Sequence, residues 1–244
     1  MQNSNKALIV GVGAEQGLGG ALAKHFASQG LQVIIAGRTQ QKLDQIKSSI
    51  ESEGGKAICV VCDVTSEESQ LELFKQVDAI PGNLELAVYN AGNSTPGEVR
   101  NMSAEYFESA WRVLCFGGFI FGRECCNRMS AAGSGTLIYT GASASLRGKA
   151  GFAAFNSGKA AMRTFAQALA KEYASENVHV AHVIIDGGIA GDRQFERMSS
   201  PPDANALDKF ISLDGLCTAY WQIHQQHHTA WTFELDLRTR HENW

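Results

Sequence analysis

The sequence lacks the features that identify several large classes of protein. None of its apolar runs approaches the roughly 20 residues that a membrane-spanning helix needs. Residues 1–6 are polar and show no basic segment followed by an apolar one, as a signal peptide would. No long basic run is present, and the formal net charge at pH 7 is −4. These absences argue against binding to nucleic acid or to an anionic membrane, and we expect a cytoplasmic protein.

Cysteine and histidine give no sign of a metal or redox centre. The six cysteines are compatible with free thiols in the cytoplasm. Cys59 and Cys62 fall on an expected strand, where a spacing of three directs the side chains to opposite faces, so we interpret them as core residues. His224, His227 and His228 fall on an expected helix without clear carboxylate or cysteine partners, which is typical of solvated or interface histidines. We therefore expect no metal.

Apolar segments alternate with helical patterns along almost the whole chain. We expect strands at residues 7–10, 32–36, 57–61, 84–89, 135–140, 178–185 and 231–237, and helices at residues 21–29, 67–77, 103–129, 152–174 and 213–225. Continuous apolar strands alternating with helices are typical of a parallel sheet covered on both faces. The sequence therefore predicts an α/β fold: a Rossmann-type, doubly wound parallel sheet in three layers, forming a single domain over residues 1–244.

The first expected strand runs directly into a glycine-rich turn. Five glycines lie between residues 11 and 20, ahead of the first helix. Without Cβ atoms the backbone bends tightly and lets a pyrophosphate approach the positive end of that helix. The next apolar strand follows at the distance expected of a βαβ unit, so the pattern indicates a dinucleotide site.

The second expected strand ends in Gly37-Arg38-Thr39. An NAD-binding unit usually carries an acidic side chain near this point, which binds the ribose hydroxyls. Here Gly37 leaves space and Arg38 offers a fork of donors that suits a phosphate. The sequence therefore favours NADP(H) over NAD(H). The alternative is that Arg38 only caps a solvated strand end.

Four motifs together resemble the short-chain dehydrogenase/reductase family over about residues 6–189: Gly13-x-x-x-Gly17-x-Gly19, Cys62-Asp63-Val64, Asn90-Ala91-Gly92, and Lys159 on the helix after the fifth strand. The resemblance implies that the first turn holds the pyrophosphate, that Arg38 meets the 2′-phosphate and that Lys159 bonds the nicotinamide ribose. The cofactor-binding residues that we expect are Gly13, Gly17, Leu18, Gly19, Arg38, Thr39, Asp63, Val64, Asn90, Ala91, Gly92, Lys159 and Ile189. The resemblance also implies a homodimer or homotetramer.

The family's proton-transfer residues are not found at the expected spacings. Phe155 stands at the tyrosine position, Ala142 at the serine position and Cys115 at the looser asparagine position. Reduction of a carbonyl by hydride leaves negative charge on oxygen, which the family's tyrosine protonates and its serine stabilises. Loss of a general acid costs on the order of 10²- to 10⁴-fold, and loss of an oxyanion donor costs a comparable factor.

Other side chains near these positions are candidates for the missing donors. Ser143 is adjacent to the serine position and would move inward with a small shift of its loop. Lys159, near a cationic nicotinamide and apolar neighbours, would have a lowered pKa and serve as the acid itself, or it would only bind the ribose. Weaker candidates are Ser145, Tyr139, Cys115 and Asp186. For these four and for Ser143, packing or turn roles are the preferred interpretation.

Two functions are compatible with this pattern. The first is an NADP(H)-preferring oxidoreductase with a non-standard proton donor, acting on a small molecule such as an apolar or aromatic carbonyl, imine or enone that stacks on Phe155. The second is a catalytically inactive NADP(H)-binding sensor or regulatory protein. The polar segment over about residues 190–212 is a candidate substrate lid or a plain surface loop.

Overall fold

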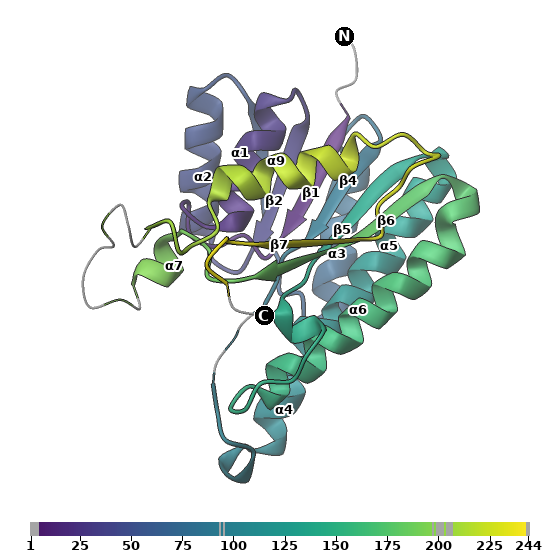
Figure 1. Ribbon diagram of the computed structural model, residues 1–244. Helices are drawn as coiled ribbons and strands as arrows, with labels where there is room; N and C mark the ends of the chain where they lie inside the picture. Colours follow the sequence, from purple (N-terminus) through teal and green to yellow (C-terminus); the bar gives the residue numbers. More distant parts are fainter. Residues whose placement is uncertain are drawn as a thin grey trace.

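The protein is described here by a computed structural model that covers residues 5–92, 94, 96–196, 198, 203 and 207–242. Within these residues, one sheet has the strand order β3-β2-β1-β4-β5-β6-β7, and all neighbouring strands are parallel (Figure 1). This confirms the predicted doubly wound α/β fold. The strands are β1 (Lys6–Val10), β2 (Gln32–Gly37), β3 (Lys56–Val61), β4 (Leu84–Tyr89), β5 (Gly135–Thr140), β6 (Val178–Asp186) and β7 (Glu234–Arg238).

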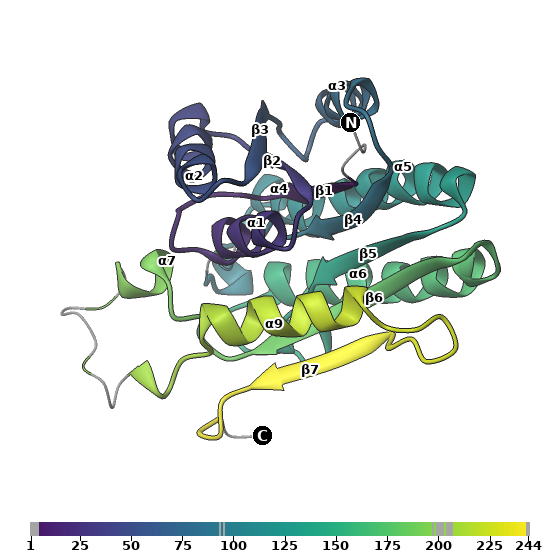
Figure 2. The same cartoon turned by 90° about the horizontal axis from the view of Figure 1, so that it is seen from above.

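Helices cover both faces of the sheet and enclose a separate apolar core on each side (Figure 2). One face carries α1 (Leu18–Ser28), α2 (Gln40–Ser52) and α9 (Leu213–His224), and the other carries α3 (Glu67–Ala79), α5 (Gly117–Ala132) and α6 (Ala153–Tyr173). The short helix α4 (Ala104–Trp111) packs on α6. Three-residue 3₁₀ turns are η1 (Val99–Asn101), η3 (Ser143–Ser145) and η4 (Ala174–Glu176).

The inner strands are buried along most of their length. All residues of β1 and all nine of β6 are buried. Helices on both faces leave no water-facing side, so residues 7–10 of β1 form an uninterrupted apolar run, whereas β6 also buries His179, His182 and Asp186. The edge strand β7 is half-buried, and its sequence alternates between charged and apolar residues.

Strand order brings the loops after β1 and β4 together. Because β1 lies between β2 and β4, the chain crosses in opposite directions on its two sides, which is where ligands bind in open α/β sheets. Gly11 has a φ of +80°, and a Cβ there would stand 2.3 Å from the backbone nitrogen of Ala91. Only glycine permits this conformation and this approach.

The long helix expected over residues 103–129 is interrupted. It consists of α4, a π-helical turn η2 (Arg112–Phe116) and α5. The hydroxyl of Tyr89 on β4 donates to the Val113 carbonyl at 2.6 Å within that turn, so a tertiary contact occupies a helix carbonyl. Helical periodicity does not reveal such a contact.

Other boundaries differ from expectation at element ends. Helix α2 has no counterpart among the predicted helices. Cys62 lies one residue beyond β3, and α9 ends at His224, so His227 and His228 follow the helix rather than belong to it. The last strand begins at Glu234, because Trp231 instead stacks on the His179 ring at 4.8 Å between centroids.

The segment expected to form a lid is described only in part. It begins with α7 (Asp192–Phe195) and returns to the fold where Ile189 bridges Ile211. Residues 197, 199–202 and 204–206 of the predicted lid lie outside the described residues. Among the described helices, none combines the length and apolar character needed to cross a membrane.

Candidate functional site

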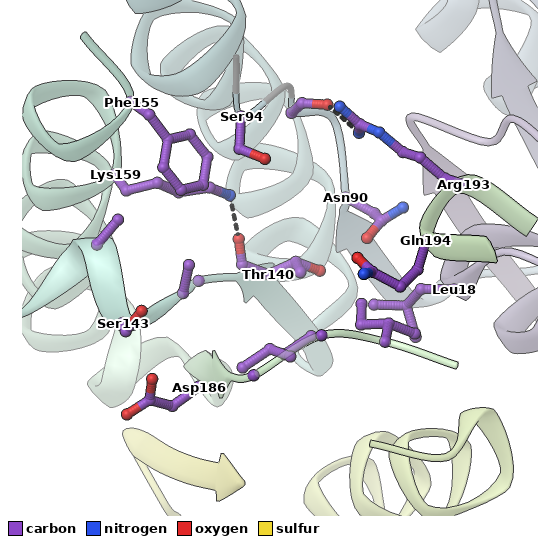
Figure 3. Close-up of a pocket in the computed structure, with 18 of the residues that line it drawn as sticks. Leu18, Asn90, Ser94, Thr140, Ser143, Phe155, Lys159, Asp186, Arg193 and Gln194 are labelled. Carbon is purple, nitrogen blue, oxygen red and sulfur yellow. Dashed lines mark hydrogen bonds between the residues drawn. The ribbon is translucent and has the colours of Figure 1, made fainter. Parts of the chain in front are cut away.

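A cleft of about 650 Å³ opens at the carboxyl ends of the central strands (Figure 3). Its walls come from the turn after β1 and the loops after β4, β5 and β6, with α6 and α7 at its sides. It brings together eleven of the residues predicted from the sequence: Gly13, Gly17, Leu18, Gly19, Asn90, Gly92, Ala142, Ser143, Phe155, Lys159 and Ile189. Other predicted residues do not line it: Arg38, Thr39, Asp63, Val64, Ala91 and Cys115.

The amino end of α1 forms an anion cradle in this cleft. Its cap, Gly17, offers no side-chain hydrogen bond, and the first turn contains no acidic residue, so backbone N–H groups remain for a ligand. A Cβ on Gly13 would meet nothing within 4 Å, whereas one on Gly19 would stand 3.2 Å from Asn90 Nδ2. Asn90 in turn donates to the Gly11 carbonyl at 3.2 Å. The cradle therefore fits a pyrophosphate.

Lys159 is the most strongly buried cation of the cleft, with 4% of its surface exposed. Its Nζ donates to the Thr140 carbonyl at 2.6 Å, and burial lowers the pKa of its amine from 10.5 to about 8. Phe155 lies one turn earlier on α6, with its ring centroid 5.9 Å from Nζ (Figure 3). A Cβ on Gly92 would stand 3.6 Å from the same nitrogen. The ammonium group therefore sits between the loops after β4 and β5.

The loop after β5 carries two serines whose side chains have different surroundings. Ser145 Oγ accepts from the Ala142 amide at 3.2 Å and lies 3.2 Å from His182 Nε2, so it is buried in the protein interior. Behind it, His182 Nδ1 pairs with Glu234 at 3.0 Å. Ser143 instead lines the cleft, and its hydroxyl has no hydrogen-bond partner in the described part of the chain. Ser143 is the hydroxyl that remains available for a ligand.

Three weaker candidate donors are directed elsewhere. Tyr139 is fully buried, donates to the Gly118 carbonyl at 2.9 Å, and has its pKa raised by burial. Cys115 lies half-buried in the π turn, where burial raises the pKa of its thiol. Asp186 holds Arg147 Nη2 at 3.0 Å from both carboxylate oxygens. Of these three, only Asp186 reaches the cleft.

A profile of the family described as short chain dehydrogenase matches residues 6–196. The chain belongs to the short-chain dehydrogenase family. This short-chain dehydrogenase is 29% identical over 199 residues to 2,3-dihydro-2,3-dihydroxybenzoate dehydrogenase of Bacillus subtilis (strain 168), a match covering 82% of this chain and 75% of the relative. It is 26% identical over 188 residues to a probable tetrahydroxynaphthalene reductase of Zymoseptoria tritici, covering 76% and 68%. A crystallised short-chain dehydrogenase from Rhodopseudomonas palustris is 33% identical, with a TM-score of 0.81 over 96% of this chain and 98% of that one.

In this short-chain dehydrogenase the end of β2 carries an unpaired cation. Arg38 is exposed and has no hydrogen-bond or ion-pair partner within the described residues. A Cβ on Gly37 would stand 2.2 Å from the Val12 carbonyl oxygen, so glycine there lets the first turn pack against β2. Asp63, by contrast, is partly occupied, because it accepts from both the amide and the hydroxyl of Thr65.

The predicted lid segment includes α7, but the sequence did not indicate which contacts α7 makes at the cleft. The Asp192 amide donates to the Gln16 carbonyl at 2.9 Å, and the Gln16 amide donates to the Asp192 carboxylate at 3.3 Å. Arg193 Nη1 reaches the Gly92 carbonyl at 3.4 Å (Figure 3). These contacts join residues far apart in the chain, so no local pattern announces them.

Proposed function

We propose that this short-chain dehydrogenase is an NADP(H)-preferring oxidoreductase that acts on a small molecule with a non-standard proton donor. The observation that carries the proposal is the opening of the uncapped α1 terminus into the same cleft as the buried Lys159. NADPH, when bound, supplies the hydride. We propose that the residues assigned by the family resemblance bind the cofactor: Gly13, Gly17, Leu18, Gly19, Arg38, Thr39, Asp63, Val64, Asn90, Ala91, Gly92, Lys159 and Ile189.

Arg38 supports the preference for NADP(H). An exposed guanidinium without a carboxylate partner is available to pair with a 2′-phosphate, and guanidinium–phosphate pairs are among the stronger charge-assisted hydrogen bonds. A ribose 2′-hydroxyl offers no charge for this contact. We therefore expect NAD(H) to bind more weakly than NADP(H), because it cannot form that pairing.

Lys159 is the proposed proton donor. Burial removes water from its amine and so lowers the pKa to about 8. At pH 7 the amine is therefore still protonated, although it is poorly solvated. A donor with a pKa near the working pH transfers its proton readily. Only one of its three N–H bonds is used by the Thr140 carbonyl. Lys159 therefore has donors left for the ribose and for a developing alkoxide.

Ser143 is the proposed oxyanion donor in place of the alanine at position 142. Its hydroxyl has no partner in the described part of the chain and faces the cleft. Ala142 and Phe155 have no side-chain proton to give. Cys115 remains only the residue at the family's asparagine position, because it does not line the cleft.

The aromatic side chains that line the cleft favour a substrate that contains a ring. Phe152 and Phe155 both line the cleft and offer flat apolar surface for an aromatic or cyclic carbonyl, imine or enone. Two relatives are named for ring compounds, a dihydroxybenzoate derivative and a tetrahydroxynaphthalene. Residues 190–212 would act as the lid, since α7 already contacts both the glycine turn and Gly92.

A second function follows if these donors do not replace the family's tyrosine and serine. Phe155 and Ala142 would then mark a protein that binds NADP(H) as a sensor without turnover.

We also propose a homodimer or homotetramer, in which a second copy covers Phe107, Trp111 and Phe119, three large apolar side chains exposed on α4 and α5.

Calorimetric titration with NADPH and NADH, followed by cofactor oxidation against ketones, aldehydes, quinones, imines and enones, tests these functions. We expect NADPH to bind more tightly than NADH and to be oxidised by at least one ring acceptor. Tight binding without turnover across the whole set supports the sensor. If neither NADPH nor NADH binds, both the oxidoreductase and the sensor function are refuted.

A further inference from the structure

The cleft as a whole contains more positive than negative side chains. Among the described residues that line the cleft, the cations are Arg147, Lys149, Lys159 and Arg193, and the anions are Asp186 and Glu242. Lys159 is assigned above to the cofactor and the proton. The loop between β5 and α6 thus brings two further cations, Arg147 and Lys149, to the cleft that Phe152 and Phe155 also line.

The negative charge of Asp186 is already paired. This side chain is buried, with 2% of its surface exposed, and it contacts two arginines. Arg147 Nη2 lies 3.0 Å from each of its oxygens, and Arg238 Nη1 lies 3.4 Å away. Asp186 therefore orients Arg147, whereas Arg238 also pairs with a second carboxylate, that of Asp236.

Arg147 has donors left over for a ligand. Only its Nη2 group bonds to Asp186, and its Nε and Nη1 hydrogens have no partner in the described part of the chain. The side chain is 46% exposed, so these hydrogens are accessible from the cleft. A guanidinium held by one carboxylate loses less conformational freedom when it binds another.

Lys149 is held above a ring that also lines the cleft. Its Nζ lies 5.2 Å from the centroid of Phe152, and it has no carboxylate partner within the described residues. The carbonyl of the same residue accepts from Asn156 at 3.2 Å, which ties the loop to α6. The cation is therefore placed at the edge of the apolar wall formed by Phe152 and Phe155.

We propose that the substrate is a ring compound with an anionic group, a carboxylate, which Arg147 and Lys149 bind while the ring lies along Phe152 and Phe155. This inference rests on the proposed function and specifies its substrate class. A neutral ring would leave the unused donors of Arg147 and the ammonium group of Lys149 without an acceptor on the ligand. A carboxylate pairs with both of them and fixes which part of the ring points toward Lys159.

Benzoate and its neutral analogue benzamide provide a test that does not require turnover. Each is titrated into the full-length protein saturated with NADPH, and binding is measured by calorimetry and by NADPH fluorescence. We expect benzoate to bind at least about tenfold more tightly than benzamide, because charge-assisted hydrogen bonds are roughly twice as strong as neutral ones. The difference should shrink as NaCl is raised.

Variants assign the binding to the two cations. Lys149→Met should reduce the benzoate preference several-fold and leave benzamide binding unchanged, since this lysine has no carboxylate partner to disturb. Arg147→Met with Asp186→Asn removes both members of the ion pair, so no buried carboxylate loses this partner; circular dichroism confirms folding. Lys75→Met is the matched control, because Lys75 is 75% exposed on α3 and should change neither affinity.

The possible results distinguish a failure of this inference from a failure of the proposed function. Tight NADPH binding with equal affinity for benzoate and benzamide overturns the anionic substrate and leaves the oxidoreductase proposal standing. A benzoate preference that survives both cleft variants also overturns it, because the anion then binds elsewhere. Failure of NADPH to bind overturns both proposals.

Discussion

Titration of Lys159 should be visible in the stability of the folded protein. Burial lowers the pKa of its amine from 10.5, its ordinary value, to about 8 in the folded state. Between these two values the unfolded chain binds more protons than the folded one, so stability rises with pH in this window. Below pH 8 the amine is charged in both states and burial costs about 3 kcal/mol.

Comparison with Lys159→Met isolates this contribution from cysteines and tyrosines that titrate in the same range. Urea unfolding followed by circular dichroism at pH 7 and pH 9.5 gives the stability of each protein. We expect the wild type to gain about 2 kcal/mol relative to Lys159→Met between these pH values. Lys75→Met, which removes an exposed lysine, controls for the loss of a surface charge.

An equal pH dependence of wild type and Lys159→Met would refute the reasoning. It would mean that the ammonium is solvated in the folded protein, and Lys159 would then lose its basis as a proton donor. A wild type that becomes less stable relative to the variant between pH 7 and 9.5 would be equally decisive. It would show that the charged form is favoured, through the Thr140 carbonyl, more than burial disfavours it.

Three other predictions test separate parts of the proposal. Arg38→Asp should weaken NADPH binding about 10- to 100-fold more than NADH binding, measured by calorimetry, because a like charge replaces the phosphate partner; equal weakening would contradict the NADP(H) assignment. Phe155→Tyr with Ala142→Ser should create broad carbonyl reductase activity, measured as NADPH oxidation, if only the proton donors are missing, and no gain would indicate a reshaped pocket. Trp111→Glu should shift the protein toward monomer in size-exclusion chromatography with light scattering, and an unchanged mass would exclude this surface as the contact between copies.

Much of the fold was predictable because buried parallel strands leave a local signature. The segments 84–89 and 135–140 form β4 and β5 with the expected bounds, since both are apolar runs buried on two sides. Helix α2 was missed because it buries only three residues in thirteen, Leu43, Ile46 and Ile50, and so carries little apolar signal. The π turn was missed because its cause, Tyr89, lies on a strand 24 residues from Val113.

The choice among candidate donors needed three-dimensional contacts. Ser143 and Ser145 are two residues apart and have the same chemistry, yet only Ser143 lines the cleft, while Ser145 contacts His182 on β6. Tyr139 has a phenol close in sequence to the missing donors but points to the Gly118 carbonyl in the core. The burial that lowers the pKa of Lys159 also arises from loops distant in the chain.

The sequence by itself determined the sheet, the glycine turn and the absence of hydroxyls at positions 142 and 155. These features depend on local residue type and spacing, which fix backbone conformation and burial pattern over a few residues. Only the tertiary structure decided which polar groups face the cleft, that α7 contacts the glycine turn, and that Arg147 and Lys149 line the same cleft as Phe152 and Phe155. Those facts depend on the crossing of distant strands and loops, for which the sequence has no periodic signal.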